Sequence, residues 1–316
     1  MDTRYRTSLA LWITLAATAG CSSSSNKSPA DAAPSLRPGV EDSSQVFQGA
    51  PNAHESAFWA AVRDGDDAGR AAAVSQLMAD VQDDPKNGYS EFLIGASYSM
   101  PPNAVLRALA DGTPIQPALP DAAAMPYLKE SLSNLTDPFY LGFAGGLLGV
   151  AEIVSGDTAE GGPTLATAAS NNPVATRLMT VISDLVAQNA ANALKDMYVL
   201  VEYCNGGPLD HNGGGAADYV AKLNAGGAVQ RECYSGYFAP HGSSGEMLLL
   251  ADLQALNGNQ PAANAYYRAL QGVSDYSTWA LKPLAERRLS GAQKADIATE
   301  AIIPATCVTC HTDTLK

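Results

Sequence analysis

The chain has 316 residues and is acidic, with 19 basic and 32 acidic side chains and a formal net charge of −13. This charge disfavours binding to nucleic acid or to an anionic lipid surface, because both carry negative charge themselves. The hydrophobic content of 46% is enough for a substantial core, and the chain contains only five cysteines and four histidines.

The first residues have the pattern of an export signal. Arg4 and Arg6 precede an apolar run, residues 8–19, that is too short to span a bilayer but suits a secretory signal. The run ends in Thr18-Ala19-Gly20-Cys21. This sequence resembles the lipobox of bacterial lipoproteins, although that family prefers leucine in the position of Thr18. The resemblance implies a signal peptide over residues 1–20 and lipid attachment to Cys21.

A disordered tether is expected after the signal. Residues 21–50 are rich in Ser, Ala and Pro, which is typical of a flexible linker. An aspartate after Cys21 would be the usual signal for retention in the inner membrane, but Ser22 stands there. We therefore expect an exported protein that is held by lipid, with the outer membrane favoured, and that faces the periplasm or the cell surface. The alternative is an ordinary secretory signal in which Cys21 has no role.

Residues 51–295 are expected to form helices. Val74, Leu77, Met78 and Val81 have the spacing of one helix face, and Asp84-Pro85 follows where that helix should end. No sustained two-residue alternation predicts a strand, so the expected fold class is all-α. Similar apolar patterns predict helix pairs around residues 57–83, 88–100, 125–136, 141–172, 175–203 and 246–289.

Small and large residues recur in these helices in a register that resembles the tetratricopeptide repeat. Glu152 and Gln254 depart from it, since the family has an aromatic residue there. The resemblance implies a tetratricopeptide-like helical hairpin array, or α-solenoid, whose surface docks a partner. The alternative is an irregular helical bundle. The matching positions are Ile94-Gly95, Tyr98, Leu148-Gly149, Gly161, Leu165, Ala168, Pro173, Ala251, Gly258-Asn259, Ala263, Tyr267 and Leu270.

Two insertions interrupt this register, a proline-rich one near residues 100–125 and a glycine-rich one near residues 205–245. Cys204 and Cys233 lie at and within the second. Because an oxidising compartment favours pairing, we expect a disulfide bond between them that closes the glycine-rich loop. Two separate thiols are the alternative. Asp210-His211 in this loop is expected to be exposed surface rather than a metal site.

Other enzyme-like patterns fail on their spacing. Asp64, Asp66 and Asp67 resemble the start of a calcium loop, but the further ligands of such a loop are missing. They predict a solvated turn between two helices. The chain also lacks a phosphate-binding loop and a nucleophile elbow. An electron carrier or a binding protein is therefore favoured over an enzyme.

The last ten residues contain Cys307-Val308-Thr309-Cys310-His311, and Cys-x-x-Cys-His is the attachment signature of c-type haem. In this signature both thiols bond covalently to the haem and the histidine becomes the proximal iron ligand. Residues 296–316 are therefore expected to form a haem-attachment tail that carries one haem c on Cys307 and Cys310, with His311 on the iron. A zinc site, a redox dithiol and the absence of any cofactor are the alternatives.

The terminal position of this pentad is similar to that in cytochrome c′, where the distal side of the haem is often open. A distal ligand could come from Met247, His241, His211 or Met179, from a partner chain, or from no residue at all. Pro304 should break any preceding helix, which favours a short terminal segment over a buried pocket for the haem.

These patterns together predict a membrane-anchored c-type cytochrome lipoprotein that transfers electrons in the periplasm or at the cell surface. The helical repeats would dock its redox partner protein. The main alternative is a helical-repeat scaffold that binds a peptide or an envelope-complex subunit, with the haem structural or absent. A haem that reacts with peroxide or a small ligand is a third interpretation.

Overall fold

Helices make up the regular structure of the part of the chain that the computed structural model describes, namely residues 52–115, 122–225, 242–291, 297–298, 300–301 and 314–315. All of these residues belong to one unit, Pro34–Lys316, and a second unit, Met1–Ala33, lies outside them. The described residues form thirteen α-helices and one 3-10 helix and contain no strand. The prediction of an all-α fold is confirmed for this part of the chain.

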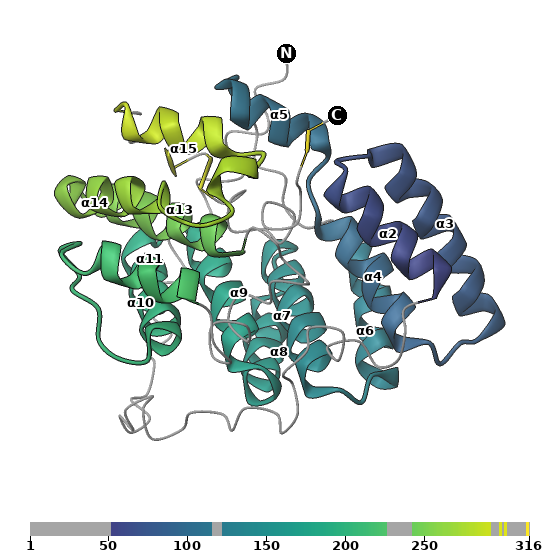
Figure 1. The fold of residues 1–316 in the computed structure, drawn as a ribbon. Helices are drawn as coiled ribbons and strands as arrows, with labels where there is room; N and C mark the ends of the chain where they lie inside the picture. Colours follow the sequence, from purple (N-terminus) through teal and green to yellow (C-terminus); the bar gives the residue numbers. More distant parts are fainter. Residues whose placement is uncertain are drawn as a thin grey trace, which may run out of the picture. The chain divides into compact units, whose positions relative to one another are not determined.

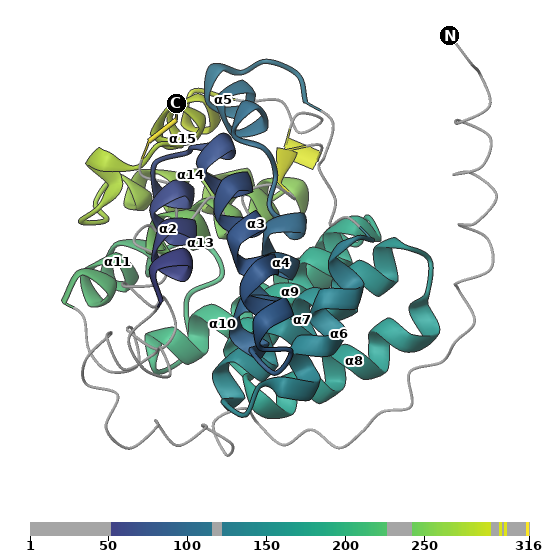
Figure 2. The same cartoon turned by 90° about the vertical axis from the view of Figure 1, so that its right-hand side faces the viewer.

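Helices that are neighbours in the sequence pack against each other in pairs, as α2, α3 and α4 do in Figure 1 and α7, α8 and α9 do in Figure 2. Each predicted helical range contains helices at nearly the expected boundaries, but residues 88–100 and 125–136 each form one helix rather than the predicted pair. In chain order the elements are α2 (Ala53–Arg63), α3 (Asp67–Asp83), α4 (Gly88–Ser99), α5 (Asn103–Asp111), α6 (Ala124–Asn134), α7 (Pro138–Val154), α8 (Thr158–Asn171), α9 (Pro173–Val186), α10 (Ala190–Asn205), α11 (Ala216–Ala225), α13 (Gly242–Leu256), α14 (Gln260–Leu270), η4 (Tyr276–Thr278) and α15 (Lys282–Leu289).

Four of the hairpins share one turn. In each, a residue with positive φ follows the first helix, and an aspartate or asparagine comes next. The N–H of this second residue bonds to the carbonyl oxygen five residues earlier, as in a Schellman motif, while its side chain caps the following helix. The four pairs are Gly65-Asp66, Gly156-Asp157, Gln188-Asn189 and Gly258-Asn259. The same local chemistry, at Gly258-Asn259 as at the other three places, thus folds four helix pairs.

Two of the second helices also end alike. Asp84 ends α3 with φ −131° and ψ 89°, and Asn172 ends α8 with φ −142° and ψ 90°. A proline follows each of them. Because proline disfavours helical geometry in the residue before it, the sequence stops both helices at the same extended conformation.

Helices α7 and α8 approach closely at small residues. An added Cβ atom at Gly149 would lie 2.7 Å from Cγ of Leu165, and one at Gly161 would lie 2.8 Å from the carbonyl oxygen of Gly149. Real Cβ atoms do not tolerate these distances, so only glycine allows this packing. These two glycines therefore lie where the paired helices meet.

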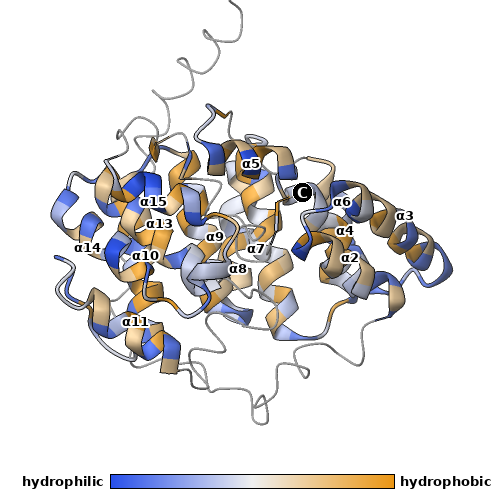
Figure 3. Cartoon of the chain, turned by 45° about the horizontal axis from the view of Figure 1, so that its top comes forward, coloured by the Kyte–Doolittle hydropathy of each residue, from blue (hydrophilic) through white to orange (hydrophobic). Residues whose placement is uncertain are grey.

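Helix α13 is buried along nearly its whole length, and hydrophobic residues run along both α13 and α7 in Figure 3. A helix that is apolar on all sides is normally enclosed by other elements. Within the described residues, no helix has both the length and the apolar character needed to cross a membrane.

Both insertions contain helices that the sequence analysis did not predict. Helix α5 lies in the proline-rich insertion and packs on α15, and α11 lies in the glycine-rich insertion and packs on α14. Pro102 does not interrupt α5, because it occupies the N-cap position just before it. Gly112, with φ +75°, ends the helix.

Candidate functional site

The most specific candidate in the sequence is the haem-attachment pentad, and its cysteines and histidine lie outside the described residues. The same holds for Cys21, Cys233 and His241. The nearest described residues are Ile297, Ala298, Glu300 and Ala301 before the pentad and Thr314 and Leu315 after it.

The upstream side is held by a buried ionic cluster. The Nε atom of Arg288 lies 3.1 Å from a carboxylate oxygen of Asp252 on α13, and its Nη2 atom lies 2.6 Å from one of Glu300. The hydroxyl of Tyr267 on α14 donates to the same Asp252 oxygen at 2.5 Å. The side chains of Arg288 and Asp252 are fully buried, and that of Glu300 is 8% exposed. The residues before the pentad therefore contribute a charge to the protein core.

Electrostatics explain why the loss of any one charged side chain would destabilise this cluster. Burial alone would lower the pKa of Arg288, but the charges of Asp252 and Glu300 outweigh it and raise that pKa, so the guanidinium stays protonated. Burial raises the pKa of Asp252, while Arg288 and Tyr267 oppose the shift. A buried ion pair is costly to break, because the remaining partner is left as an uncompensated charge in the core.

A second arginine extends the cluster to the proline-rich insertion. The Nη2 atom of Arg287 lies 3.2 Å from Glu300, and its Nη1 atom donates to the carbonyl oxygens of Leu109 and Ala110 at 2.7 and 3.3 Å. These carbonyl groups end α5, where a positive charge is favourable to the helix dipole. Glu300 thus connects the segment before the pentad to α15 directly and to α5 through Arg287.

The downstream side is attached to the turn between α2 and α3. The N–H of Thr314 donates to the carbonyl oxygen of Arg63 at 3.2 Å, and its hydroxyl donates to that of Asp64 at 3.0 Å. Gly65, with φ +60°, leaves room for the Thr314 carbonyl, with which a side chain would collide. Leu315 packs against the apolar core. Described residues on both sides of the pentad, Glu300 and Thr314, therefore contact the helices.

The three aspartates of this turn have structural roles. Asp64 ends α2, and Asp66 caps α3 through the N–H of Gly69 at 3.0 Å. Asp67 accepts the N–H of Asn103 at 2.8 Å and so binds the start of α5. The predicted turn between helices is confirmed. A small pocket lies beside it, lined by residues of α2, α3 and α5 together with Pro101.

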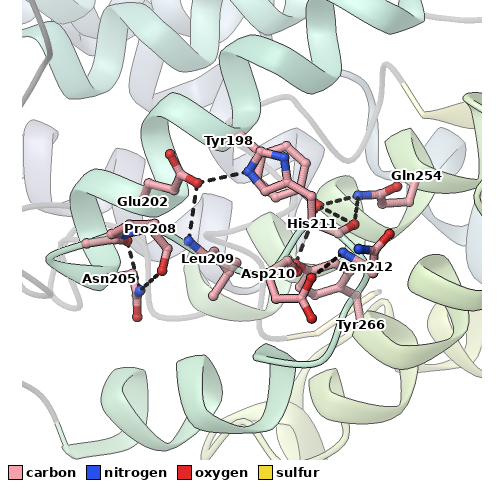
Figure 4. Close-up of polar contacts among 11 residues, drawn as sticks. Tyr198, Glu202, Asn205, Pro208, Leu209, Asp210, His211, Asn212, Gln254 and Tyr266 are labelled. Atoms are coloured by element: carbon pink, nitrogen blue, oxygen red, sulfur yellow. Dashed lines mark hydrogen bonds and ion pairs between the residues drawn. The ribbon is translucent and has the colours of Figure 1, made fainter.

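The glycine-rich loop after α10 is attached to the helices through its backbone carbonyl groups, which accept hydrogen bonds. The side-chain amide of Gln254 and the hydroxyl of Tyr198 both donate to the carbonyl oxygen of His211, at 3.0 and 3.2 Å. The hydroxyl of Tyr266 donates to that of Asp210 at 3.2 Å (Figure 4). These donors come from α13, α10 and α14, so the loop is hydrogen-bonded to three helices. Gln254, which departs from the repeat pattern, serves this purpose.

His211 itself lies on the surface, as expected. Its imidazole stacks on the ring of Tyr198 with centroids 3.6 Å apart, and its Nε2 atom lies 2.9 Å from a carboxylate oxygen of Glu202 (Figure 4). The side chain is 56% exposed. This arrangement brings together one histidine and one carboxylate, and groups of three or more possible metal ligands are absent from the part of the chain that the structure describes.

The structure places the other candidate residues in the core. Met179 on α9 and Met247 on α13 are 0% and 1% exposed, and Met179 packs against Gly146 of α7. Both fill space between helices. Cys204 at the end of α10 is fully buried and disulfide-bonded, and its partner lies outside the described residues. Its pairing with Cys233 stays a prediction.

No protein-family model matches the chain, and no curated protein or solved structure shows significant similarity to it. The functional conclusion therefore depends on the residues of the chain itself.

The cluster of Arg287, Arg288, Asp252 and Glu300 was not among the sites predicted from the sequence. One signal was present, because Asp252 interrupts the otherwise apolar run of residues 247–253 and a buried aspartate needs a cationic partner. Nothing in the sequence indicated which arginine that partner would be.

Proposed function

We propose that this protein is an exported, lipid-anchored carrier of one c-type haem and that it transfers electrons to or from a partner protein. The observation that carries the proposal is the Cys-x-x-Cys-His pentad, Cys307 to His311, in a chain that begins with an export signal. Such a chain reaches the compartment where haem attachment takes place. The attachment of residues on both sides of the pentad to the helices supports it, because a cofactor used for electron transfer needs a defined position.

The residues of the chain would act in distinct ways. The thiols of Cys307 and Cys310 would bind the haem covalently, and His311 would hold the iron from one side. The haem supplies one-electron chemistry when it is bound. Met179 and Met247 are enclosed by other helices, which favours an open distal side or a ligand from elsewhere. The acidic surface would suit a basic redox partner.

We further propose that the hairpins form a tetratricopeptide-like array. The shared turn supports this, since Gly156 and Gln188 are 32 residues apart and Gln188 and Gly258 are 70 residues apart. These spacings are close to one and two periods of about 34 residues. The close packing at Gly149 and Gly161 also suits a hairpin repeat. The array would present the docking surface for the redox partner.

The test is the intact mass and the visible spectrum of the mature protein, produced in a host that attaches c-type haem. We expect the mass of one haem beyond polypeptide and lipid, and an absorption band that sharpens on reduction. Serine at both 307 and 310 should abolish covalent haem, while His311→Ala should disturb the coordination of the iron. A mature protein without the haem mass would exclude the carrier and leave the scaffold function, in which the array binds an envelope-complex subunit.

The lipid anchor is tested separately. Cys21→Ala should move the protein from the membrane fraction to the soluble periplasmic fraction, because its acidic surface gives no other attraction to anionic lipid. A wild-type protein that is already soluble and begins at another residue would exclude lipid attachment at Cys21.

A further inference from the structure

We propose that Asn212, in the glycine-rich loop after α10, is a site of spontaneous deamidation. In this reaction the backbone nitrogen of the following residue attacks Cγ of the asparagine, and ammonia leaves to give a cyclic succinimide. Water then opens the ring and yields aspartate or isoaspartate, so neither an enzyme nor an oxidant is needed. A following glycine favours the attack, because it has no side chain to hinder the approach.

The chain offers its own comparison, because it contains four Asn-Gly dipeptides and the structure describes all of them. They begin at Asn87, Asn205, Asn212 and Asn257. In each dipeptide the glycine N–H donates to a backbone carbonyl oxygen at 2.9–3.0 Å. Since this bond is common to all four, it does not distinguish the glycine nitrogens as nucleophiles. The difference lies in the asparagine side chains.

Two of these side chains are each held by more than one hydrogen bond. The Nδ2 atom of Asn205 donates to the carbonyl oxygen of Gly207 at 2.9 Å, and its Oδ1 atom accepts from Nζ of Lys222 at 2.8 Å. The Nδ2 atom of Asn257 donates to the carbonyl oxygen of Ala190 at 2.8 Å and to a second carbonyl within its own helix. These bonds oppose rotation of the side chain toward the next backbone nitrogen.

The other two side chains differ from each other. The Oδ1 atom of Asn87 accepts the N–H of Ser90 at 3.1 Å and so caps α4. The side chain of Asn212 is exposed and makes no hydrogen bond within the described part of the chain, while its backbone N–H donates to the Asp210 carboxylate at 2.9 Å (Figure 4). Of the four asparagines, Asn212 is therefore the one whose side chain can turn toward the glycine nitrogen without losing a bond.

Deamidation would also loosen the loop. Ring closure removes the hydrogen that Gly213 donates to the carbonyl oxygen of Asp210 at 2.9 Å. Isoaspartate then adds a carbon atom to the backbone beside Gly213, which packs tightly on α14: an added Cβ there would lie 2.7 Å from Cβ of Ala265. The new carboxylate would also stand beside Asp210, whose own carboxylate accepts the N–H groups of Asn212 and Gly214, and like charges repel.

The experiment follows all four dipeptides in the full-length mature protein, kept folded at mildly alkaline pH, by peptide mapping with mass spectrometry. Ammonia release and enzymatic methylation of isoaspartate identify the product. We expect Asn212 to react roughly fivefold or more faster than the other three, because each of them must first give up at least one hydrogen bond. In protein unfolded by denaturant, the four rates should become similar.

Asn212→Gln is the matched variant, since it keeps the amide but its longer side chain disfavours ring closure. It should abolish the fast reaction and leave the other three rates unchanged. After the same incubation, amide hydrogen exchange of residues 209–215 should be roughly tenfold faster in the wild type than in this variant, because the modified loop opens more easily.

An Asn212 that reacts no faster than the other three in the folded protein would overturn the proposal. So would the same order of rates in the unfolded protein, because sequence context rather than structure would then set that order. Equal exchange of the incubated wild type and Asn212→Gln would contradict the loosening of the loop. None of these measurements needs haem, so they are independent of the proposed function.

Discussion

Helices α7 and α13 are both buried on almost every side, but they pack by different means. Helix α7 carries four glycines and one charged residue, Glu152, and it fits its neighbours by close approach of backbones. Helix α13 carries Glu246, Asp252 and Gln254 within its buried length. Two of these bind polar groups that come from distant parts of the chain, while Oε2 of Glu246 has no hydrogen-bond partner.

This difference shows how one fold keeps its hairpins in place in two ways. Packing around α7 depends on side-chain volume, because a Cβ atom added at its glycines would collide with a neighbouring helix. Packing around α13 depends on charge and hydrogen bonds, so a change of volume matters less than the loss of a partner. The two helices should therefore respond to different substitutions.

The largest effect is expected from Arg288→Met, which keeps a long apolar side chain but removes the cation between Asp252 and Glu300. Leaving two buried carboxylates without it should lower the free energy of unfolding by about 3–5 kcal/mol. Chemical denaturation of the purified variant measures this loss. Arg268→Met on the exposed face of α14 is the control and should stay near the wild type. A loss for Arg288→Met no larger than that of the control would mean that α13 does not depend on its charge partners.

A smaller effect is expected from Gly161→Ala, which breaks the close approach of α8 to α7. The new Cβ would lie 2.8 Å from a backbone oxygen and 2.6 Å from Ile153, and such overpacking costs about 1–3 kcal/mol. The neighbouring Gly162 has no atom within 4 Å of an added Cβ. Gly162→Ala should therefore stabilise the helix by up to about 1 kcal/mol. Thermal unfolding of the two variants tests this expectation. An equal change in the stability of both would show that the packing of α7 on α8 does not depend on side-chain volume.

Glu246 sharpens the comparison, since Oε2 of its buried carboxyl has no hydrogen-bond partner and, unlike Asp252, it has no arginine beside it among the described residues. Burial raises the pKa of Glu246 well above its usual 4.5. The folded state then binds a proton that the unfolded state releases, so stability falls as the pH rises above that value. Glu246→Gln should remove this fall and stabilise the protein at neutral pH by about 1–2 kcal/mol. The measurement is denaturation at several pH values, and a variant with the wild-type pH profile would contradict the assignment.

The smallest effect is expected on α9, which packs on α7 and carries Asp184. Burial, and then the nearby charge of Asp196, raise the pKa of Asp184 from 3.8 to about 6. The folded state therefore holds a proton at low pH, and this contribution is lost as the pH rises through that range. Asp184→Asn should remove about 1 kcal/mol of the change in the free energy of unfolding between pH 3.8 and about 6, after allowance for solvent screening. Asp218→Asn, an exposed change on α11, is the control, and a parallel response of the two would contradict the role of Asp184.

The helix pairs could be predicted because their signals are local. Apolar spacing, a capping side chain before many of the helices and a proline after some of them are readable within a few residues. Helices α5 and α11 were missed for a local reason, since prolines and glycines were interpreted as breakers. The apolar residues Val105, Leu106 and Leu109 have helical spacing and could have revealed α5.

The ionic cluster could not be predicted, because its members are far apart in the sequence. Asp252 and Arg288 are separated by 36 residues, and Arg287 and the Leu109 carbonyl by 178. Which partners meet across such distances depends on how the hairpins stack, and no local pattern carries that information. The same applies to Thr314, whose small polar side chain gave no sign that it would bind the turn after α2.

The contacts of Thr314 and Arg287 also bear on how the protein unfolds. In an open array of repeats each terminal unit has a single neighbour, so the ends fray first and unfolding spreads inward. Here the turn after α2 is bonded to a residue 250 positions later, and α5 is bonded to Arg287 of α15. The ends of the array thus stabilise each other. Fraying at one end would require loss of contacts at the other, which makes unfolding more cooperative than the hairpin architecture alone would suggest.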